Sequence, residues 1–212
     1  MKSQDILLML KLVSLERQQS AAVPEDRGAL AIPNDWRGWD PEPADRHGAD
    51  PMAVADEAYS VRALEESTGI SKSQVSGSLR RCIDVGLARA ERGSGLTRAN
   101  TRALQEFITH GLKLVFPAQP GPLVRGIPTA HAAPVLAGRL MSAGAHIHVW
   151  EDASGSLQGQ RVEPLYKSVP RAVRRDAQLY AMLALVDAIR LGRERESALA
   201  GKLLGQYLGK PK

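Results

Sequence analysis

YSVRALEESTGISKSQVSGSLRRCIDVGLA, residues 59–88, predicts two short helices joined by a tight turn. Ser60 is the expected N-cap of the first helix, whose apolar residues stand at helical spacing. Gly69 should end that helix, because glycine readily adopts the left-handed conformation found at helix C-termini. Ser71 should cap the second helix, and Gln74, three residues later, would complete a capping box.

The second helix, residues 71–84, is predicted to be amphipathic. Its apolar stripe, at i, i+4, i+7 and i+8, consists of Val75, Leu79, Cys82 and Ile83. Its opposite face is small, polar and cationic. The candidate DNA-contacting residues on this helix are Ser71, Lys72, Ser73, Gln74, Ser76, Ser78, Arg80 and Arg81. A helix with such a face can lie in the major groove and hydrogen-bond both phosphates and base edges.

A short β-hairpin is predicted at residues 88–98, directly after the second helix. Alternating residues flank a Gly-Ser-Gly tip at 93–95, and glycine tolerates the unusual backbone angles of a tight turn. A hairpin beside a recognition helix acts as a wing. Arg92 and Arg98 are therefore expected to reach phosphate or the minor groove.

Residues 59–102 resemble the winged helix-turn-helix regulators of the MarR-like superfamily. The segment ALEESTGISKSQVSGSLRRCIDVGL, residues 63–87, would correspond to the positioning helix, the turn, the recognition helix and the Gly-Leu that enters the wing. The resemblance implies a sequence-specific DNA-binding transcriptional regulator, most simply a dimeric repressor. The chain departs from the superfamily pattern in its very short wing, in a long insert before the motif, and in lacking the long dimerising helices of close MarR relatives.

The distribution of charge supports the same region as a nucleic-acid contact. The formal net charge is only +5. Residues 16–57 carry ten acids and four arginines, a balance of −6, whereas residues 62–102 carry eight bases and four acids, a balance of +4. Positive charge is therefore concentrated on the helix pair and the hairpin, as binding to a polyanion requires.

The chain is predicted to be mainly α with small β-hairpins, in two parts. Residues 1–112 would form a winged helix-turn-helix domain, interrupted at about 17–55 by an acidic insert rich in proline and glycine. Trp36 and Trp39 are expected to tie this insert to the body of the protein. Residues 113–212 would form a C-terminal α+β region that dimerises, senses a small molecule or holds a protein partner.

Further elements are predicted on either side of the motif. Residues 5–16 should form a helix capped by Ser3, with an apolar face broad enough to contact two surfaces: the helix-turn-helix core and a second one, such as a partner subunit. The other expectations are a helix capped by Asn100 or Thr97 and ending near Leu112, an ordered extended loop at 113–134, a short helix from Pro134 to Ser142, two strands at 146–150 and 160–163 across a turn, and tail helices from Asp176 and over 193–208.

The expected partner is double-stranded DNA, bound by a homodimer. Helix 5–16 and the tail helices have apolar surface with which two copies of the chain could associate. The alternative is a winged-helix module that binds protein, as antitoxin-like or assembly adaptors do, with no sequence-specific DNA site. A basic face of small residues favours DNA, since a protein-binding face would be more apolar.

Cys82 is the single cysteine, which excludes an internal disulfide and a multi-cysteine zinc site and fits a reducing cytoplasm. It is interpreted as a small buried hydrophobe, and the alternative is a redox sensor whose oxidation would displace the helix. No segment approaches the ~20 apolar residues needed to span a membrane. The apolar run at 6–15 lacks a signal-peptide cleavage site, so a cytoplasmic protein is expected.

His146 and His148 stand two residues apart, so on a strand they would face one side and could bind a metal together with His131 or Asp152. Transition-metal sites generally need three or four converging ligands, so a partly exposed strand face is the preferred interpretation. No Ser-His-Asp order, carboxylate-pair motif, Gly-rich phosphate loop or zinc-hydrolase helix is recognisable. The sequence therefore predicts no metal, no cofactor and no enzymatic activity.

Overall fold

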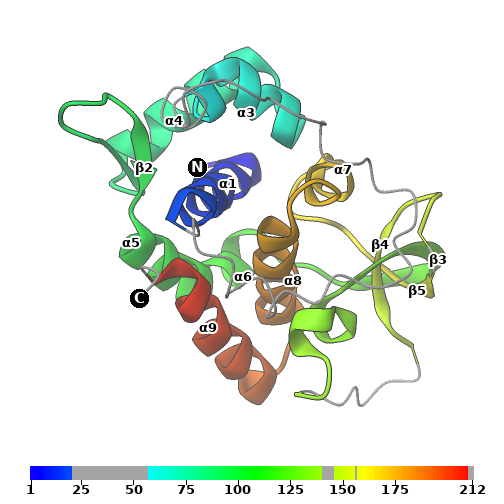
Figure 1. Cartoon of the computed structure of the whole chain (residues 1–212). Coiled ribbons are helices and arrows are strands. Elements are labelled where there is room, and N and C mark those ends of the chain that lie inside the picture. Colours follow the sequence, from blue (N-terminus) through cyan, green and yellow to red (C-terminus); the bar gives the residue numbers. More distant parts are fainter. Residues whose placement is uncertain (21–56, 140–145, 156, 210–212) are drawn as a thin grey trace.

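The structure is a computed structural model of the 212-residue chain, and it describes residues 1–20, 57–139, 146–155 and 157–209. These residues form a mixed α+β fold that is mainly helical, with small sheets, as expected (Figure 1). Trp36, Trp39 and nearly all of the acidic insert lie outside the described residues. The described start of the insert, residues 17–20, is helical and continues the first helix.

Helix α1, Ser3–Ser20, is the central helix of the molecule. Residues 4–15 are buried without interruption, so the helix is enclosed on every side rather than along one stripe. Figure 1 shows α1 surrounded by helices that follow it along the chain. The second surface that was expected to meet a partner subunit is covered by the C-terminal helix α8, Ala177–Leu191, of the same chain.

The helix pair and the hairpin form as predicted. Their elements are α3 (Val61–Thr68), α4 (Lys72–Asp84), β1 (Ala88–Ala90) and β2 (Thr97–Ala99). The Ser60 hydroxyl accepts the Ala63 N–H at 3.2 Å, and Gly69 ends α3 with a φ of +69°. Ser71 occupies the N-cap position of α4, but its side chain makes no capping hydrogen bond. The predicted capping box is therefore wrong, because the Gln74 side chain is hydrogen-bonded to Tyr166 instead.

A helical segment follows the hairpin and bends back toward the C-terminal half. It consists of α5 (Thr101–Glu106), a π-helical turn (Phe107–Gly111) and α6 (Leu112–Val115). Asn100 is the cap, since its side-chain oxygen accepts the Ala103 N–H at 3.3 Å, whereas Thr97 lies in β2. The helix predicted to end near Leu112 thus continues for one more turn.

The prediction of a loop throughout residues 113–134 is wrong, because Pro120–Thr129 form strand β3 within this segment. Strands β4 (His148–Glu151) and β5 (Leu157–Val162) both form, but they pair in parallel and do not make the expected hairpin. Each of them pairs antiparallel with β3. The pattern of the two short strands could not reveal this arrangement, because their common partner precedes both in the chain.

Close backbone approach explains two glycines of this sheet. A Cβ on Gly126 would lie 1.9 Å from the carbonyl oxygen of Trp150, and one on Gly159 would lie 2.5 Å from that of Ile147. Only glycine allows strands to approach so closely. After β3 come two 3-10 turns, Ala130–Ala132 and Pro134–Leu136, in place of the start of the helix predicted at 134–142.

Three helices complete the chain: α7 (Val169–Val173), α8 and α9 (Glu194–Leu208). Residues from α1, α3, α4, α5, α8 and α9 belong to one continuous hydrophobic core, which therefore spans the boundary expected near residue 112. The apolar faces of α1 and α8, which were expected to make a dimer, are buried in this core.

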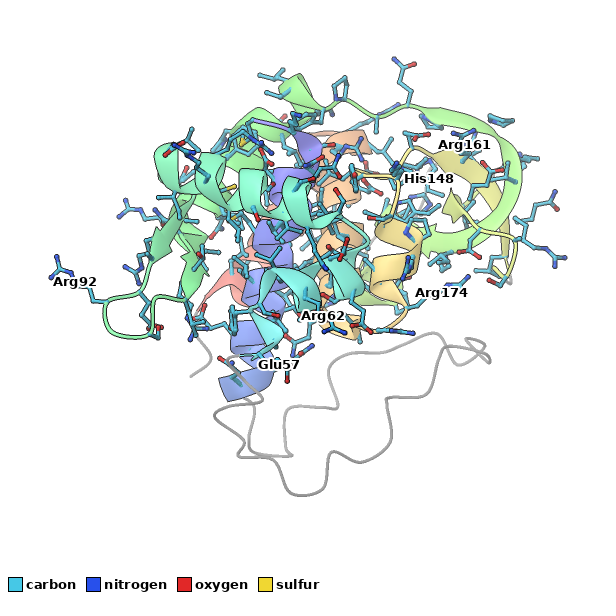
Figure 2. All side chains as sticks on the ribbon, turned by 90° about the horizontal axis from the view of Figure 1, so that it is seen from above. Glu57, Arg62, Arg92, His148, Arg161 and Arg174 are labelled. Atoms are coloured by element: carbon cyan, nitrogen blue, oxygen red, sulfur yellow. The ribbon has the colours of Figure 1, made fainter. Side chains whose placement is uncertain are left out.

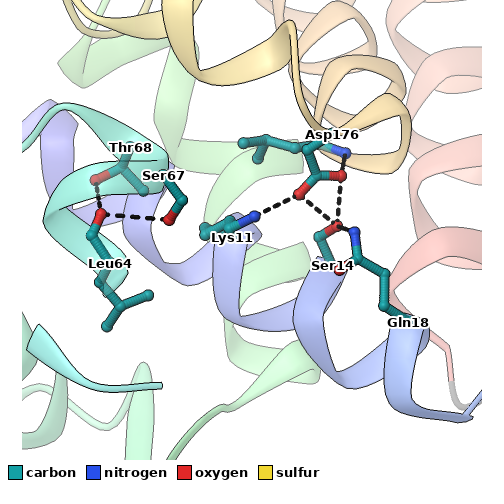
Figure 3. A network of polar contacts seen from close by, with 8 residues as sticks. Lys11, Ser14, Gln18, Leu64, Ser67, Thr68 and Asp176 are labelled. Atoms are coloured by element: carbon teal, nitrogen blue, oxygen red, sulfur yellow. Dashed lines mark hydrogen bonds and ion pairs between the residues drawn. The ribbon is translucent and has the colours of Figure 1, made fainter. Parts of the chain in front are cut away.

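A buried ion pair fixes α1 against α8 (Figure 3). The Lys11 ammonium donates to Asp176 at 2.8 Å, and the Ser14 hydroxyl donates to the same carboxylate at 2.7 Å. Asp176 also caps α8 by accepting the Leu179 N–H at 2.9 Å. A buried charge is tolerated when it is paired and hydrogen-bonded, so this network sets the position of α1, on which α4 rests.

Candidate nucleic-acid interface

The face of α4 that points away from α1 has the polar and cationic character expected of a DNA-contacting surface. Five of its predicted site residues lie on this exposed face, and Ser71 is exposed beside them. These five residues are Lys72, Ser73, Gln74, Ser76 and Arg80. Four of the five lie in the first two turns of the helix, the end at which recognition helices contact base edges. We name them, with Ser71, the α4 polar face.

Ser78 and Arg81 were predicted to face DNA, and the structure corrects both assignments. Ser78 is fully buried, and its hydroxyl donates a short hydrogen bond to Asp5 near the start of α1. Arg81 donates to the same carboxylate through Nε at 3.1 Å and Nη2 at 2.6 Å. Both side chains therefore anchor α4 to α1. Asp5 stands more than seventy residues earlier in the chain, so the spacing within the helix could not reveal this partner.

The electrostatics of Asp5 favour its ionised form. Burial by itself would raise the pKa of this carboxyl, but hydrogen bonds from Arg81, Ser78 and the Lys2 N–H outweigh it, so the pKa is lowered from its ordinary value. Arg81, whose side chain is 34% exposed, is charged in any case, and the hydrogen bond and ion pair with Asp5 raise its pKa further. The contact is thus a charge-assisted pair that holds α4 in place against α1.

The buried stripe of α4 is shifted from the predicted one. Val75, Ser78 and Cys82 are buried and Leu79 packs partly against the core, whereas Ile83 is 41% exposed. Burial raises the pKa of the Cys82 thiol to about 12, with a further contribution from Asp5. A thiol that stays protonated is a poor nucleophile, so this environment supports the interpretation of Cys82 as a small buried hydrophobe.

Arg92 and Arg98, the two hairpin residues that were predicted to contact phosphate, have different environments. Arg92 is exposed at the tip and projects from the body of the molecule (Figure 2). Arg98 is instead only 18% exposed. Its guanidinium lies 4.6 Å from the ring centre of Tyr59 and pairs with Glu91 at 3.3 Å. The assignment of Arg98 as a phosphate contact is therefore wrong, because the side chain fastens the hairpin to the chain entering α3.

Sequence reasoning missed the C-terminal residues that contact the helix pair. The Tyr166 hydroxyl donates to the Gln74 side-chain oxygen at 3.2 Å, and the Ser168 hydroxyl donates to the Thr68 carbonyl at 2.5 Å. Ser168 also approaches Gly69 closely, since a Cβ on that glycine would lie 2.9 Å from Ser168 Cβ. No local pattern in the sequence signals these contacts, which join residues about a hundred positions apart.

The C-terminal end of α4 differs from its beginning. Ile83 and Val85 are exposed there, at 41% and 62%, together with Met1 at 47%. A cavity of about 180 Å³ opens beside them, lined by Met1, Asp5, Arg81, Cys82, Asp84 and Val85. Small-molecule sites usually occupy about 300 Å³ or more, so this cavity is too small to indicate an effector site.

The histidines do not gather into a metal site. Within the described ranges, no group of three or more His, Cys, Asp and Glu side chains could hold a metal ion. His146 is exposed, and the Asp152 carboxylate is paired with Arg174 at 2.5 Å. His148 instead meets His131, with ring centres 4.7 Å apart. Burial lowers the pKa of both histidines, and repulsion from His131 lowers that of His148 further.

Comparison with protein-family models, with curated proteins and with solved structures finds no match to this chain. Among the described helices, none is long and apolar enough to cross a bilayer. The α4 polar face and its surroundings are therefore the features of the described residues that bear on function.

Proposed function

We propose that this protein is a sequence-specific DNA-binding transcriptional regulator, acting as a repressor through a winged helix-turn-helix. The observation that carries the proposal is the α4 polar face, which is exposed at the N-terminal end of a helix anchored by Asp5 and flanked by a hairpin with Arg92 at its tip. Small polar residues allow the backbone of a helix to enter the major groove closely. Their hydroxyl and amide groups match the donors and acceptors on base edges.

The proposal divides the roles of these residues. Lys72, Ser73, Gln74 and Ser76 would meet base edges from the first two turns of α4. Arg80 and Arg92 would bind phosphates, because both are exposed and neither is paired with another described residue. Arg81 and Arg98 would contribute indirectly, by holding α4 and the hairpin in the orientation that the duplex requires.

A homodimer remains part of the proposal. One recognition helix reads only a few base pairs, and useful specificity usually comes from two half-sites about one helical turn apart. Because α1 is enclosed within the chain, the interface would use exposed surface elsewhere. Leu114 and Val115, at the end of α6, are 82% and 52% exposed and are candidates for it.

A protein-binding adaptor is the second candidate function. Exposed Met1, Ile83 and Val85 provide an apolar surface at the far end of α4, which is the kind of surface that a protein partner covers. The two candidate functions make different predictions. Substitutions in the α4 polar face would affect DNA binding, whereas substitutions of Met1, Ile83 or Val85 would affect protein binding.

Selection of duplexes from a randomised DNA library by the full chain tests the leading proposal. We expect a defined sequence to be enriched, and the Gln74→Ala variant to lose preference for it while retaining its binding to unrelated duplex. Arg195→Ala/Lys202→Ala, which alters two exposed bases of α9, serves as the control and should leave binding unchanged. If the full chain enriches no sequence and binds no duplex at low salt, the proposal is wrong.

A further inference from the structure

The segment at residues 166–171 lies directly beside the proposed DNA-reading helix. Tyr166 contacts Gln74 in the first turn of α4, and Ser168 contacts Thr68 at the turn between α3 and α4. Helix α7, which begins at Val169, packs against α3. This segment therefore reaches the N-terminal end of α4 from the side opposite the hairpin, which contacts the other end.

Two cations of this segment are free to bind an anion. Lys167 and Arg171 are exposed, and neither makes a hydrogen bond or ion pair with another described residue. Lys167 stands between the two residues that contact the helix pair, and Arg171 follows in α7. Arg174, at the end of α7, is by contrast held by Asp152 at 2.5 Å, so it is not available in the same way.

The acidic side chains nearby are largely neutralised. Glu65 accepts the Lys72 N–H at 3.3 Å and lies 3.9 Å from the Lys72 ammonium. Glu163 pairs with Arg161 at 2.7 Å. Glu66, on α3 against which α7 packs, is exposed and makes no ion pair with another described residue. Lys167 and Arg171 therefore leave the segment with a net positive charge beside α4.

We propose that the segment at residues 166–171 is a second phosphate-binding arm of the DNA interface, in which Lys167 and Arg171 contact the backbone that borders the major groove. This inference rests on the proposed function. The groove is about 12 Å wide, so a duplex that receives the first turn of α4 has its phosphates within reach of long side chains beside that turn. Figure 2 shows Arg92, at the tip of the hairpin, and Arg174, which marks the end of α7, toward opposite ends of the face that α3 and α4 present.

With this arm, the C-terminal half of the chain would contact DNA directly. Contacts from the hairpin and from this arm would clamp the two phosphate chains on either side of α4. Phosphate contacts fix register and orientation on the duplex without reading sequence. The arm would accordingly strengthen binding to selected and unrelated duplexes by the same factor.

The Lys167→Ala/Arg171→Ala variant tests the arm, with Arg195→Ala/Lys202→Ala as the control matched in charge. Binding to the selected duplex and to an unrelated duplex is measured as a function of salt. Each lost phosphate contact lowers the slope of log K against log salt by about 0.9, so the test variant should lose about two contacts and the control none. Both pairs are exposed, and an unchanged melting temperature verifies that the variants are folded.

The outcomes distinguish the two proposals. If the unmodified chain binds duplex DNA but the test variant keeps its full salt slope, the proposal of a phosphate-binding arm is wrong and the proposed function is unaffected. If the unmodified chain binds no duplex at low salt, both proposals fail. A loss of binding to the selected duplex alone would also overturn the arm, since it would mean that these residues read bases rather than phosphates.

Discussion

The Asp5 carboxylate near the start of α1 accepts a hydrogen bond from Arg81 Nη2 of α4 at 2.6 Å, and the same oxygen, Oδ1, accepts the Ser78 hydroxyl. This contact explains how a helix with a polar outer face is oriented on an apolar core. It also gives Ser78 and Arg81 a structural role, although the sequence pattern predicts that both contact DNA. The consequences for stability and for binding can be measured separately.

Asp5→Asn should destabilise the protein, because it removes the charge that holds Arg81 and weakens the hydrogen bond from Ser78. We expect the free energy of unfolding to fall by about 2 kcal/mol in chemical denaturation, the scale of a hydrogen bond to a charged group. Glu66→Gln, on an exposed carboxylate of α3, is the control and should change it little. An unaltered unfolding free energy in Asp5→Asn would contradict the anchoring role.

The same pair predicts a dependence of stability on pH. The pKa of Asp5 is lowered in the folded state relative to its ordinary value of 3.8. Its contribution is therefore fully present above pH 3.8 and is lost as the pH falls through the lower pKa of the folded protein. Asp5→Asn should flatten the acid limb of the stability curve in this range.

Arg80 and Arg81 are adjacent but should respond differently to substitution. Arg80→Ala should lower the salt slope of DNA binding by about 0.9, the value for one phosphate contact, and leave the melting temperature unchanged. Arg81→Ala should lower the melting temperature because the buried Asp5 carboxylate loses its charged partner. Identical effects of the two variants on the salt slope, with no difference in stability, would mean that Arg81 leaves Asp5 to bind phosphate.

Tyr166→Phe removes the hydroxyl that donates to Gln74 and should reduce discrimination between selected and unrelated duplexes. Gln74→Ala is expected to cost roughly 1–3 kcal/mol on the selected site, and Tyr166→Phe a part of that. In a double-mutant cycle, the effect of Tyr166→Phe should disappear when Gln74 is already alanine. Additive effects would show that Tyr166 does not position Gln74 for base reading.

The pair of His131 and His148 should make the protein less stable in mild acid. Burial lowers the pKa of both below the ordinary 6.5, while Glu196 opposes the shift. As the pH falls below 6.5, the unfolded chain takes up protons first, so the free energy of unfolding decreases. His131→Phe should reduce this decrease, which urea unfolding at a series of pH values measures. The same substitution at the exposed His110 should not alter it.

Local patterns were sufficient for the helix pair, the hairpin and most of the helices. Ser60, Gly69 and Asn100 act within three or four residues of where they stand, so their caps and turns can be predicted from neighbouring residues. The apolar run of α1 predicts a helix for the same reason. Strand β3 was missed because its prolines suggest a loop, and only pairing with β4 and β5 stabilises it as a strand.

The roles of individual side chains depended on partners far away in the chain. Ser78, Arg81 and Arg98 carry the same chemistry as their exposed neighbours, and only Asp5, Tyr59 and Glu91 distinguish them. Composition and periodicity thus established that α4 is an amphipathic helix with a cationic face, since those properties are local. Which cations remain free for a ligand was decided by the tertiary structure, because an ion pair depends on the distance between side chains and not on their separation in sequence.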